Sequence, residues 1–133
     1  MNSVLGATGV AHIALVCDHF DDTIAFYERL GAVRQAGWGE GNRRIQLMEL
    51  AGGTCVELFA WGDGTTPPSG RWVHVALAVE DVEAAYQAAL AAGAKPKNPP
   101  RVVEIDSTIG KRVIHCAFVF GPEGEELEFF RFQ

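Results

Sequence analysis

The sequence is poor in cysteine, with three in 133 residues. Cys17, Cys55 and Cys116 are far apart in the chain and form no Cys-x-x-Cys pair. An odd number of scattered cysteines favours neither a disulfide framework nor a thiolate zinc site. We therefore expect three buried structural thiols.

The chain also lacks long apolar runs and an excess of basic residues. No run approaches the roughly 18 apolar residues of a membrane-spanning helix, and the first residues lack the pattern of a signal peptide. Lys and Arg number 11 against 17 Asp and Glu, a formal net charge of −6. This balance disfavours a nucleic-acid partner, because phosphate binding needs clustered positive charge. We expect a cytoplasmic, single-domain protein without a membrane or nucleic-acid partner.

Two segments of the chain are similar to each other. VAHIALVCDHFDDTIAFYERLGA (10–32) and WVHVALAVEDVEAAYQAALAAGA (72–94) each read as a strand, an acidic turn, a helix and Gly-Ala. In this alignment His12 falls on His74. Each segment therefore predicts a helix of about ten residues preceded by a strand that carries a histidine.

The helix boundaries follow from their end residues. Asp21 and Asp81 are suitable N-caps, and Gly31 and Gly93 are suitable residues just beyond the last turn. The apolar residues of the second segment recur at helical spacing from Val82 onward.

Each predicted helix is followed by segments typical of β-hairpins. RIQLMEL and TCVELFAW flank AGG, and RVIHCAFVF and EELEFFRF flank GPEG. Glu57 lies four residues after Gly53, and Glu128 lies four residues after Gly124. Glu57 and Glu128 therefore occupy equivalent places in the two halves.

These elements predict an α+β fold within one domain, residues 1–133. It consists of two βαβββ modules, at about 8–61 and 71–132, that form paired curved mixed sheets. Residues 62–70, rich in Gly and Pro, are expected to link the modules. Residues 95–101 are expected to form a second Pro-rich loop, and residues 37–42 a flexible hairpin.

The repeat singles out His12, Glu57, His74 and Glu128. Because side chains alternate faces along a strand, His12 shares its face with small residues, as does His74. Any one of these residues alone is more often structural than functional. Two imidazoles and two carboxylates at matched places are a natural ligand set for a divalent ion such as Ni, Co, Zn, Mn or Fe.

With these motifs the chain resembles the vicinal oxygen chelate superfamily, which includes glyoxalase I, methylmalonyl-CoA epimerase, extradiol dioxygenases and bleomycin-binding proteins. HIALVCDHFDDTIAFYERLGA, VELFAW, HVALAVEDVEAAYQAALAAGA and FGPEGEELEFF carry the resemblance. It implies the paired βαβββ fold, a homodimer, and a divalent metal ion on the first and last strands of each module. The implied metal ligands are His12, Glu57, His74 and Glu128.

The order His, Glu, His, Glu is similar to bacterial glyoxalase I. This resemblance implies a lyase or isomerase that moves a proton on a small α-oxo or α-hydroxy carbonyl substrate, with Glu128 as general base and Glu57 as its partner on the opposite side. Glyoxalase I typically has an arginine four residues after the first histidine, where this chain has Val16, and an asparagine three residues after the first glutamate, where this chain has Ala60. Dependence on glutathione is therefore doubtful. The residues that could replace these two side chains are Arg43, Arg44, Arg112 and His115.

Two alternatives stay open at this stage. An epimerase acting on another chelating substrate would suit the missing arginine. A drug- or metabolite-binding resistance protein would suit the acidic balance and the three tryptophans. Binders of that kind usually lack the metal residues, so the ligand set favours an enzyme.

Overall fold

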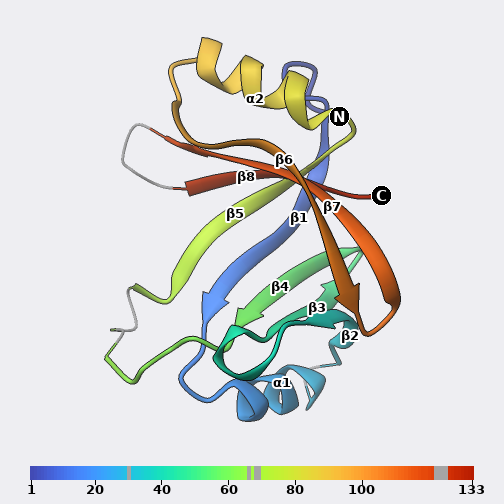
Figure 1. Cartoon of the computed structure of the whole chain (residues 1–133), viewed down its shortest axis with the longest axis vertical. Coiled ribbons are helices and arrows are strands. Elements are labelled where there is room, and N and C mark those ends of the chain that lie inside the picture. The colour runs from blue at the N-terminus through green and yellow to red at the C-terminus, as the bar shows by residue number, and fades with distance from the viewer. Residues whose placement is uncertain (30, 66, 68–69, 122–125) are drawn as a thin grey trace. The chain divides into compact units, whose positions relative to one another are not determined.

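The computed structural model describes residues 1–29, 31–65, 67, 70–121 and 126–133 (Figure 1). Among these residues no helix is both long and apolar enough to cross a membrane. The elements are, in chain order, β1 (Ala7–Val16), α1 (Phe20–Arg29), β2 (Val33–Trp38), the 3-10 helix η1 (Gly41–Arg43), β3 (Ile45–Ala51), β4 (Thr54–Phe59), β5 (Trp72–Val79), α2 (Val82–Ala91), β6 (Lys95–Ser107), β7 (Gly110–Phe120) and β8 (Glu126–Phe132). The order βαβββ thus occurs twice, which confirms the predicted α+β fold.

The chain divides into two compact units. The His12 unit contains residues 12–73 and 106–111, and the His74 unit contains residues 1–11, 74–105 and 112–133. Strands follow the order β2-β3-β4-β1 in the His12 unit and β5-β8-β7-β6 in the His74 unit. In each case the first and last strands of a module are parallel neighbours, β1 with β4 and β5 with β8.

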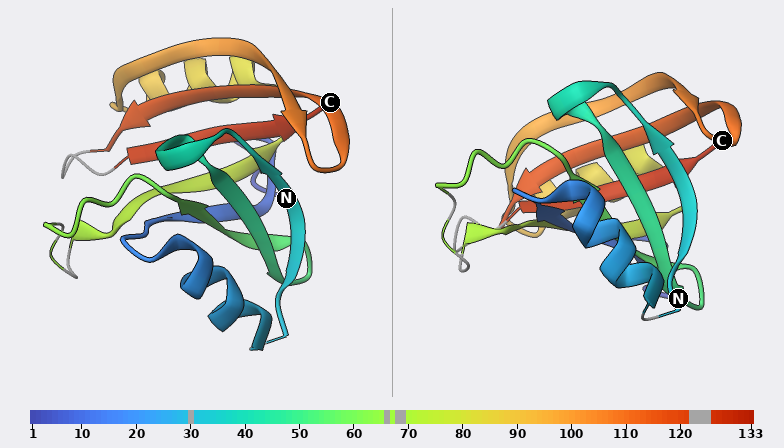
Figure 2. Two further views of the ribbon diagram at one scale, coloured as in Figure 1. Left: turned by 60° about the horizontal axis from the view of Figure 1, so that its bottom comes forward. Right: turned by 90° about the horizontal axis from the view of Figure 1, so that it is seen from below.

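In the His12 unit, α1 covers one face of the sheet (Figure 2). Phe20 and Ile24 of α1 pack in one cluster with Met48 of β3 and with Val56 and Leu58 of β4. Side chains alternate between the two faces along a strand, so the residues of β3 and β4 that alternate with these have their side chains on the opposite face of the sheet. The hairpin from β3 to β4 turns through two consecutive glycines with positive φ, 59° and 83°, a conformation that glycine adopts without steric cost.

In the His74 unit, α2 packs on the sheet in the same way. Val82 and Tyr86 lie in a cluster with Phe129 of β8 and Val119 of β7. The predicted cap is confirmed, since the Asp81 side chain accepts a hydrogen bond of 2.9 Å from the backbone N–H of Ala84. Gly93 follows the helix with a φ of 106°, as its place beyond the C-cap predicts.

The predicted loop at residues 95–101 is wrong, because these residues begin β6. β6 is the last strand in the order and has β7 as its neighbour. An edge strand tolerates proline, which lacks the N–H that a central strand needs. Pro96, Pro99 and Pro100 are therefore compatible with this strand.

The predicted cap at Asp21 is also wrong. α1 begins at Phe20, so Asp21 lies within its first turn, where a carboxylate is favoured by the helix dipole. Its carboxylate pairs with Arg44 instead, at 3.1 Å. The turn GPEG, from which the place of Glu128 was counted, falls largely outside the described residues, since 122–125 are not among them.

The three cysteines are buried and free, which confirms the prediction of structural thiols. Burial raises the pKa of Cys17 and raises that of Cys55 to about 11, with Glu49 and Glu57 adding to the shift at Cys55. Both thiols are therefore protonated near neutral pH, and neither has the low pKa of a reactive cysteine.

Candidate functional site

His12 and Glu57 form a buried pair within the His12 unit. His12 Nε2 lies 3.4 Å from Glu57 Oε1. The exposed fractions of the two residues are 1% and 6%. In the parallel pairing of β1 with β4, the Cα partner of Glu57 is Ala14, two residues after the histidine. The side chains of His12, Ala14 and Glu57 therefore share one face of this sheet.

Apolar side chains flank this pair on the same face. Ala14, Val16 and Phe59 form a cluster on it, and the Phe59 ring stacks on Trp61 with centroids 3.9 Å apart. A carboxylate in such surroundings costs free energy unless a positive charge meets it. The apolar neighbours of Glu57 thus indicate that a cation balances its charge.

His74 and Glu128 form the corresponding pair within the His74 unit. His74 Nε2 lies 2.9 Å from Glu128 Oε2, and the exposed fractions of the two residues are 8% and 4%. The Cα partner of Glu128 on β5 is Ala76, again two residues after the histidine. The His74 ring contacts Phe118 of β7 edge to face, with centroids 5.3 Å apart.

The two pairs are built alike. Each brings an imidazole nitrogen and a carboxylate oxygen together on one face, from the first and last strands of a module. Imidazole and carboxylate are the donors that Zn²⁺ and the other late first-row ions accept, and a divalent cation would offset the charge of two buried carboxylates. The residues therefore fit a divalent metal by donor type, burial and charge.

Two candidates for the missing arginine lie in the His74 unit. His115 alternates with Cys116 and shares its face with Ala117 and Val119, which belong to the cluster under α2. It is therefore on the face opposite to Glu128 and does not replace the missing arginine there. Arg112 and Phe118 have their side chains on the same face of β7, and Phe118 is the Cα partner of Glu128. Arg112 lies six residues before Phe118 along the strand.

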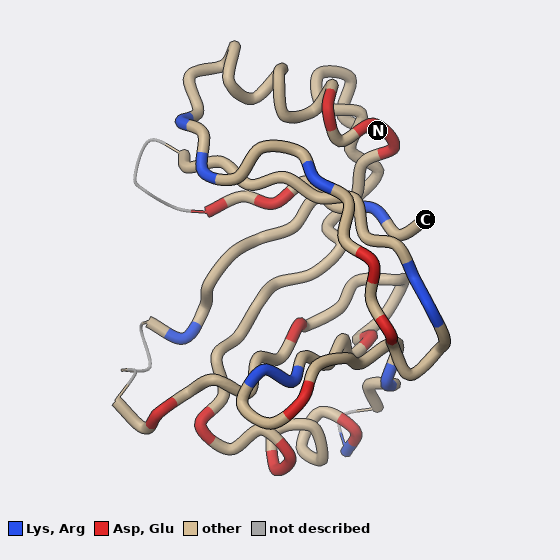
Figure 3. Tube along the Cα trace, in the orientation of Figure 1, with Lys and Arg blue, Asp and Glu red and all other residues tan. Residues whose placement is uncertain are grey.

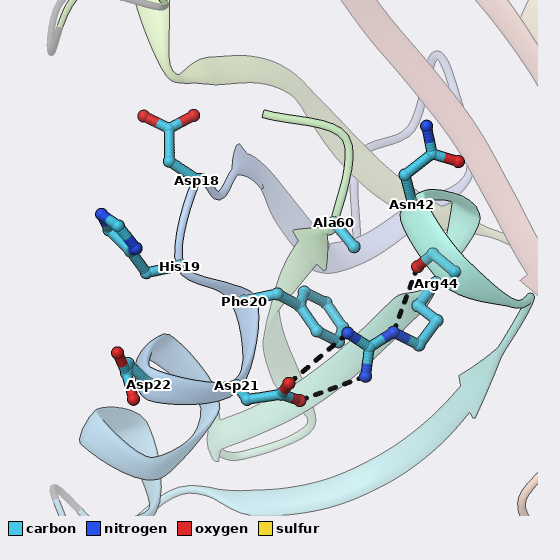
Figure 4. A pocket seen from close by; sticks show the side chains of 9 residues that line it. Asp18, His19, Phe20, Asp21, Asp22, Asn42, Arg44 and Ala60 are labelled. Atoms are coloured by element: carbon cyan, nitrogen blue, oxygen red, sulfur yellow. Dashed lines mark hydrogen bonds and ion pairs between the residues drawn. The ribbon is translucent and has the colours of Figure 1, made fainter. Parts of the chain in front are cut away.

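The other two candidates, Arg43 and Arg44, lie at η1 and immediately after it in the His12 unit. Arg44 pairs with Asp21, and its guanidinium lies 4.8 Å from the centroid of the Phe20 ring (Figure 4). Arg44, Asp21 and Phe20 line a cleft of about 450 Å³ together with Ala60.

This cleft lies on the helix side of the sheet. Phe20 belongs to the cluster of α1 with Val56 and Leu58, and Ala60 packs against that cluster. Glu57 alternates with Val56 and Leu58, so its side chain is on the other face. The cleft is therefore separate from the His12–Glu57 pair, and Arg44 does not replace the missing arginine there.

Sequence reasoning missed one charged residue on the face of the His74–Glu128 pair. Lys97 Nζ lies 2.6 Å from Glu126 Oε1. In Figure 3 the basic start of β6 and the acidic start of β8 lie close together in the His74 unit. Residues 95–101 were expected to form a loop, and the alternation of side chains between two faces holds only within a strand. The sequence therefore did not predict on which face Lys97 lies.

Comparisons with solved structures place the fold. Methylmalonyl-CoA epimerase from Mycobacterium tuberculosis has a TM-score of 0.68 and 17% identity, covering 98% of this chain and 91% of that chain. The hypothetical protein BH1468 from Bacillus halodurans has a TM-score of 0.66 and 18% identity, covering 91% of each chain. The Mn(II)-bound glyoxalase from Novosphingobium aromaticivorans has a TM-score of 0.63 and 24% identity, covering 93% of this chain and 38% of that chain.

Comparison of the amino-acid sequence with known proteins and with family models identifies the family. A search of curated proteins finds no match to the chain. The family model described as Glyoxalase/Bleomycin resistance protein/Dioxygenase superfamily matches residues 9–129, nearly the whole chain. The chain therefore belongs to the Glyoxalase/Bleomycin resistance protein/Dioxygenase superfamily.

Proposed function

We propose that the protein is a metal-dependent enzyme of glyoxalase type. One divalent ion is held jointly by His12, Glu57, His74 and Glu128. The reaction is a proton transfer on a small α-oxo or α-hydroxy carbonyl compound, catalysed by a cytoplasmic homodimer. The single observation that carries this proposal is the pair of matched, buried His–Glu contacts, one at 3.4 Å and one at 2.9 Å.

Three arguments support a shared ion. Each of the four residues offers one ligand atom, and all four are buried. Two buried carboxylates carry the charge that one divalent ion neutralises. The chain belongs to a superfamily that includes glyoxalases, and one solved relative of the same fold is a Mn(II)-bound glyoxalase.

The residues then have distinct roles. When bound, the metal supplies positive charge that stabilises the oxyanion developing beside the reacting carbon. His12 and His74 would hold the metal through their ring nitrogens. Glu128 accepts the proton from carbon and returns it to the neighbouring carbon, and Glu57 faces the substrate from the other side. The apolar neighbours of each pair exclude water from the reacting atoms.

A substrate other than the glutathione adduct of glyoxalase I is favoured by Val16. This residue is 8% exposed and packs with Ala14 and Phe59 on the face of the His12–Glu57 pair. A buried valine offers no charge to a glutathione carboxylate. An epimerase-type reaction is the second candidate, because it uses the same proton transfer on another chelating substrate.

We expect turnover of methylglyoxal with glutathione to be weak or absent. The reason is the apolar wall at Val16, where the resemblance to glyoxalase I would require an arginine. Lactoylglutathione formation can be followed by absorbance with the metal-loaded protein. Turnover comparable to that of a dedicated glyoxalase would show that glutathione is used after all. It would also favour a glyoxalase-type reaction over an epimerase-type reaction.

We expect the protein purified without chelator or affinity metal to contain about one divalent ion per chain. His74→Ala should lose this ion, because removing one of four ligands weakens a metal site by about 100-fold or more. Elemental analysis after dialysis measures the metal content. Glu104→Gln, at an exposed position on β6, is the matched control and should retain it. A metal-free wild-type protein with intact circular dichroism, also after incubation with each metal, would refute the metal site.

A further inference from the structure

The side chain of Lys97 crosses a strand of the His74 unit. Lys97 starts on β6, and its ammonium lies 5.6 Å from the ring centroid of Phe118 and 5.7 Å from that of Phe120, both on β7. It ends 2.6 Å from Glu126 Oε1 on β8. The two aromatic rings beneath the side chain hold the ammonium by cation–π attraction and fix its direction.

The strand register brings this ammonium close to the His74–Glu128 pair. Glu126 is the Cα partner of His74 in the pairing of β5 with β8, and of Phe120 in the pairing of β7 with β8. Phe118, the Cα partner of Glu128, contacts the His74 ring at 5.3 Å and the Lys97 ammonium at 5.6 Å. One aromatic ring thus separates the lysine from the histidine, and all these side chains share one face.

Lys97 keeps the capacity to bind a further anion. An ammonium has three N–H donors, and the contact with Glu126 Oε1 uses one of them. The side chains of Lys97 and Glu126 are 32% and 24% exposed, so a ligand can reach the pair. A carboxylate carries one negative charge, equal in size to the charge of the ammonium, whereas a phosphate group carries up to two.

We infer that Lys97 binds a carboxylate at the far end of the substrate, while the chelating oxygens of the substrate occupy the metal. This inference rests on the proposed function, and it names the substrate class as an oxo or hydroxy acid with a second, distal carboxylate. Glu126 holds the ammonium in place before the substrate arrives and competes with the substrate carboxylate for it. Lys97 is therefore a specificity residue and takes no part in the proton transfer.

Two probes of equal chain length test the inference. 2-Oxoadipate and 2-oxohexanoate share the same chelating end, and only 2-oxoadipate carries a carboxylate at the sixth carbon. Isothermal titration with the metal-loaded protein measures both affinities. We expect 2-oxoadipate to bind about tenfold more tightly, the usual effect of one charge-assisted hydrogen bond.

Variants of Lys97 and Glu126 should change the preference for 2-oxoadipate in opposite directions. Lys97→Met should remove the preference for 2-oxoadipate and leave the affinity for 2-oxohexanoate unchanged, whereas Lys97→Arg should retain part of the preference. Glu126→Gln should increase the preference, because the competing carboxylate is gone. Lys95→Met, two residues earlier at an exposed position of β6, is the control and should behave as the wild type.

Three results would overturn the inference. Equal affinities of the wild type for the two probes would exclude a carboxylate subsite, as would a lack of binding of both probes. Lys97→Met could also weaken the binding of both probes equally, with both affinities restored when Glu126→Gln is added to it. That result would show that the lysine serves only to neutralise Glu126. Metal content measured on the same samples separates these results from a failure of the proposed function, in which the wild type holds no metal.

Discussion

Glu128→Gln is expected to slow proton transfer by about 100-fold or more, the usual contribution of a positioned general base. The amide has the shape of the carboxylate and keeps an oxygen next to His74 Nε2, which lies 2.9 Å from Glu128 in the wild type. It cannot accept a proton at neutral pH. The proton transfer can be measured directly with the metal-loaded protein in deuterated water. NMR follows the replacement of the carbon-bound protons of hydroxyacetone by deuterium.

The matched variant is Glu57→Gln, which makes the same change in the other pair. Glu57 faces the substrate from the other side in the proposed mechanism, so its variant should retain more exchange than Glu128→Gln at equal metal content. A greater loss in Glu57→Gln would reverse the roles of the two glutamates. Full exchange activity in Glu128→Gln would exclude Glu128 as the base.

The internal repeat made the two His–Glu pairs predictable. A single histidine in an apolar strand has many structural explanations. An alignment of residues 10–32 with 72–94 places His12 on His74, and the hairpin turns place Glu57 and Glu128 in equivalent positions, each four residues after a glycine. The structure gives this equivalence a physical form, because the Cα partner of each glutamate is the alanine two residues after the histidine. Parallel pairing of the first and last strands of each module creates that match.

The features outside the repeat were not predictable in the same way. The prolines at the start of β6 favour a loop by local preference, and only the edge position of the strand makes them compatible with a sheet. The direction of Lys97 depends on the rings of β7 beneath it. The faces of Arg44 and His115 depend on where a strand begins and on which side a helix packs. These are tertiary facts that no short segment of the sequence contains.

Phe129→Ala is expected to lower the free energy of unfolding by about 3–5 kcal/mol, the usual cost of emptying a buried aromatic position. Phe129 is 0% exposed and lies in the cluster beneath α2. Its Cα partners on the neighbouring strands are Leu77 and Ala117, whose small or flexible side chains leave a cavity when the ring is removed. Urea unfolding followed by circular dichroism measures the change.

Two variants calibrate this effect. Phe129→Leu keeps most of the volume and should cost about 1–2 kcal/mol, so it remains measurable if the alanine variant fails to fold. Phe26→Ala removes a ring that is 47% exposed on α1 and should cost less than about 1 kcal/mol. Phe129→Leu should also keep its metal, because Phe129 and Glu128 point to opposite faces of β8. Loss of metal without loss of stability in Phe129→Leu would show that the two faces of this strand are not independent. Retention would show that alternate residues of β8 separate the ligand from the core that supports it.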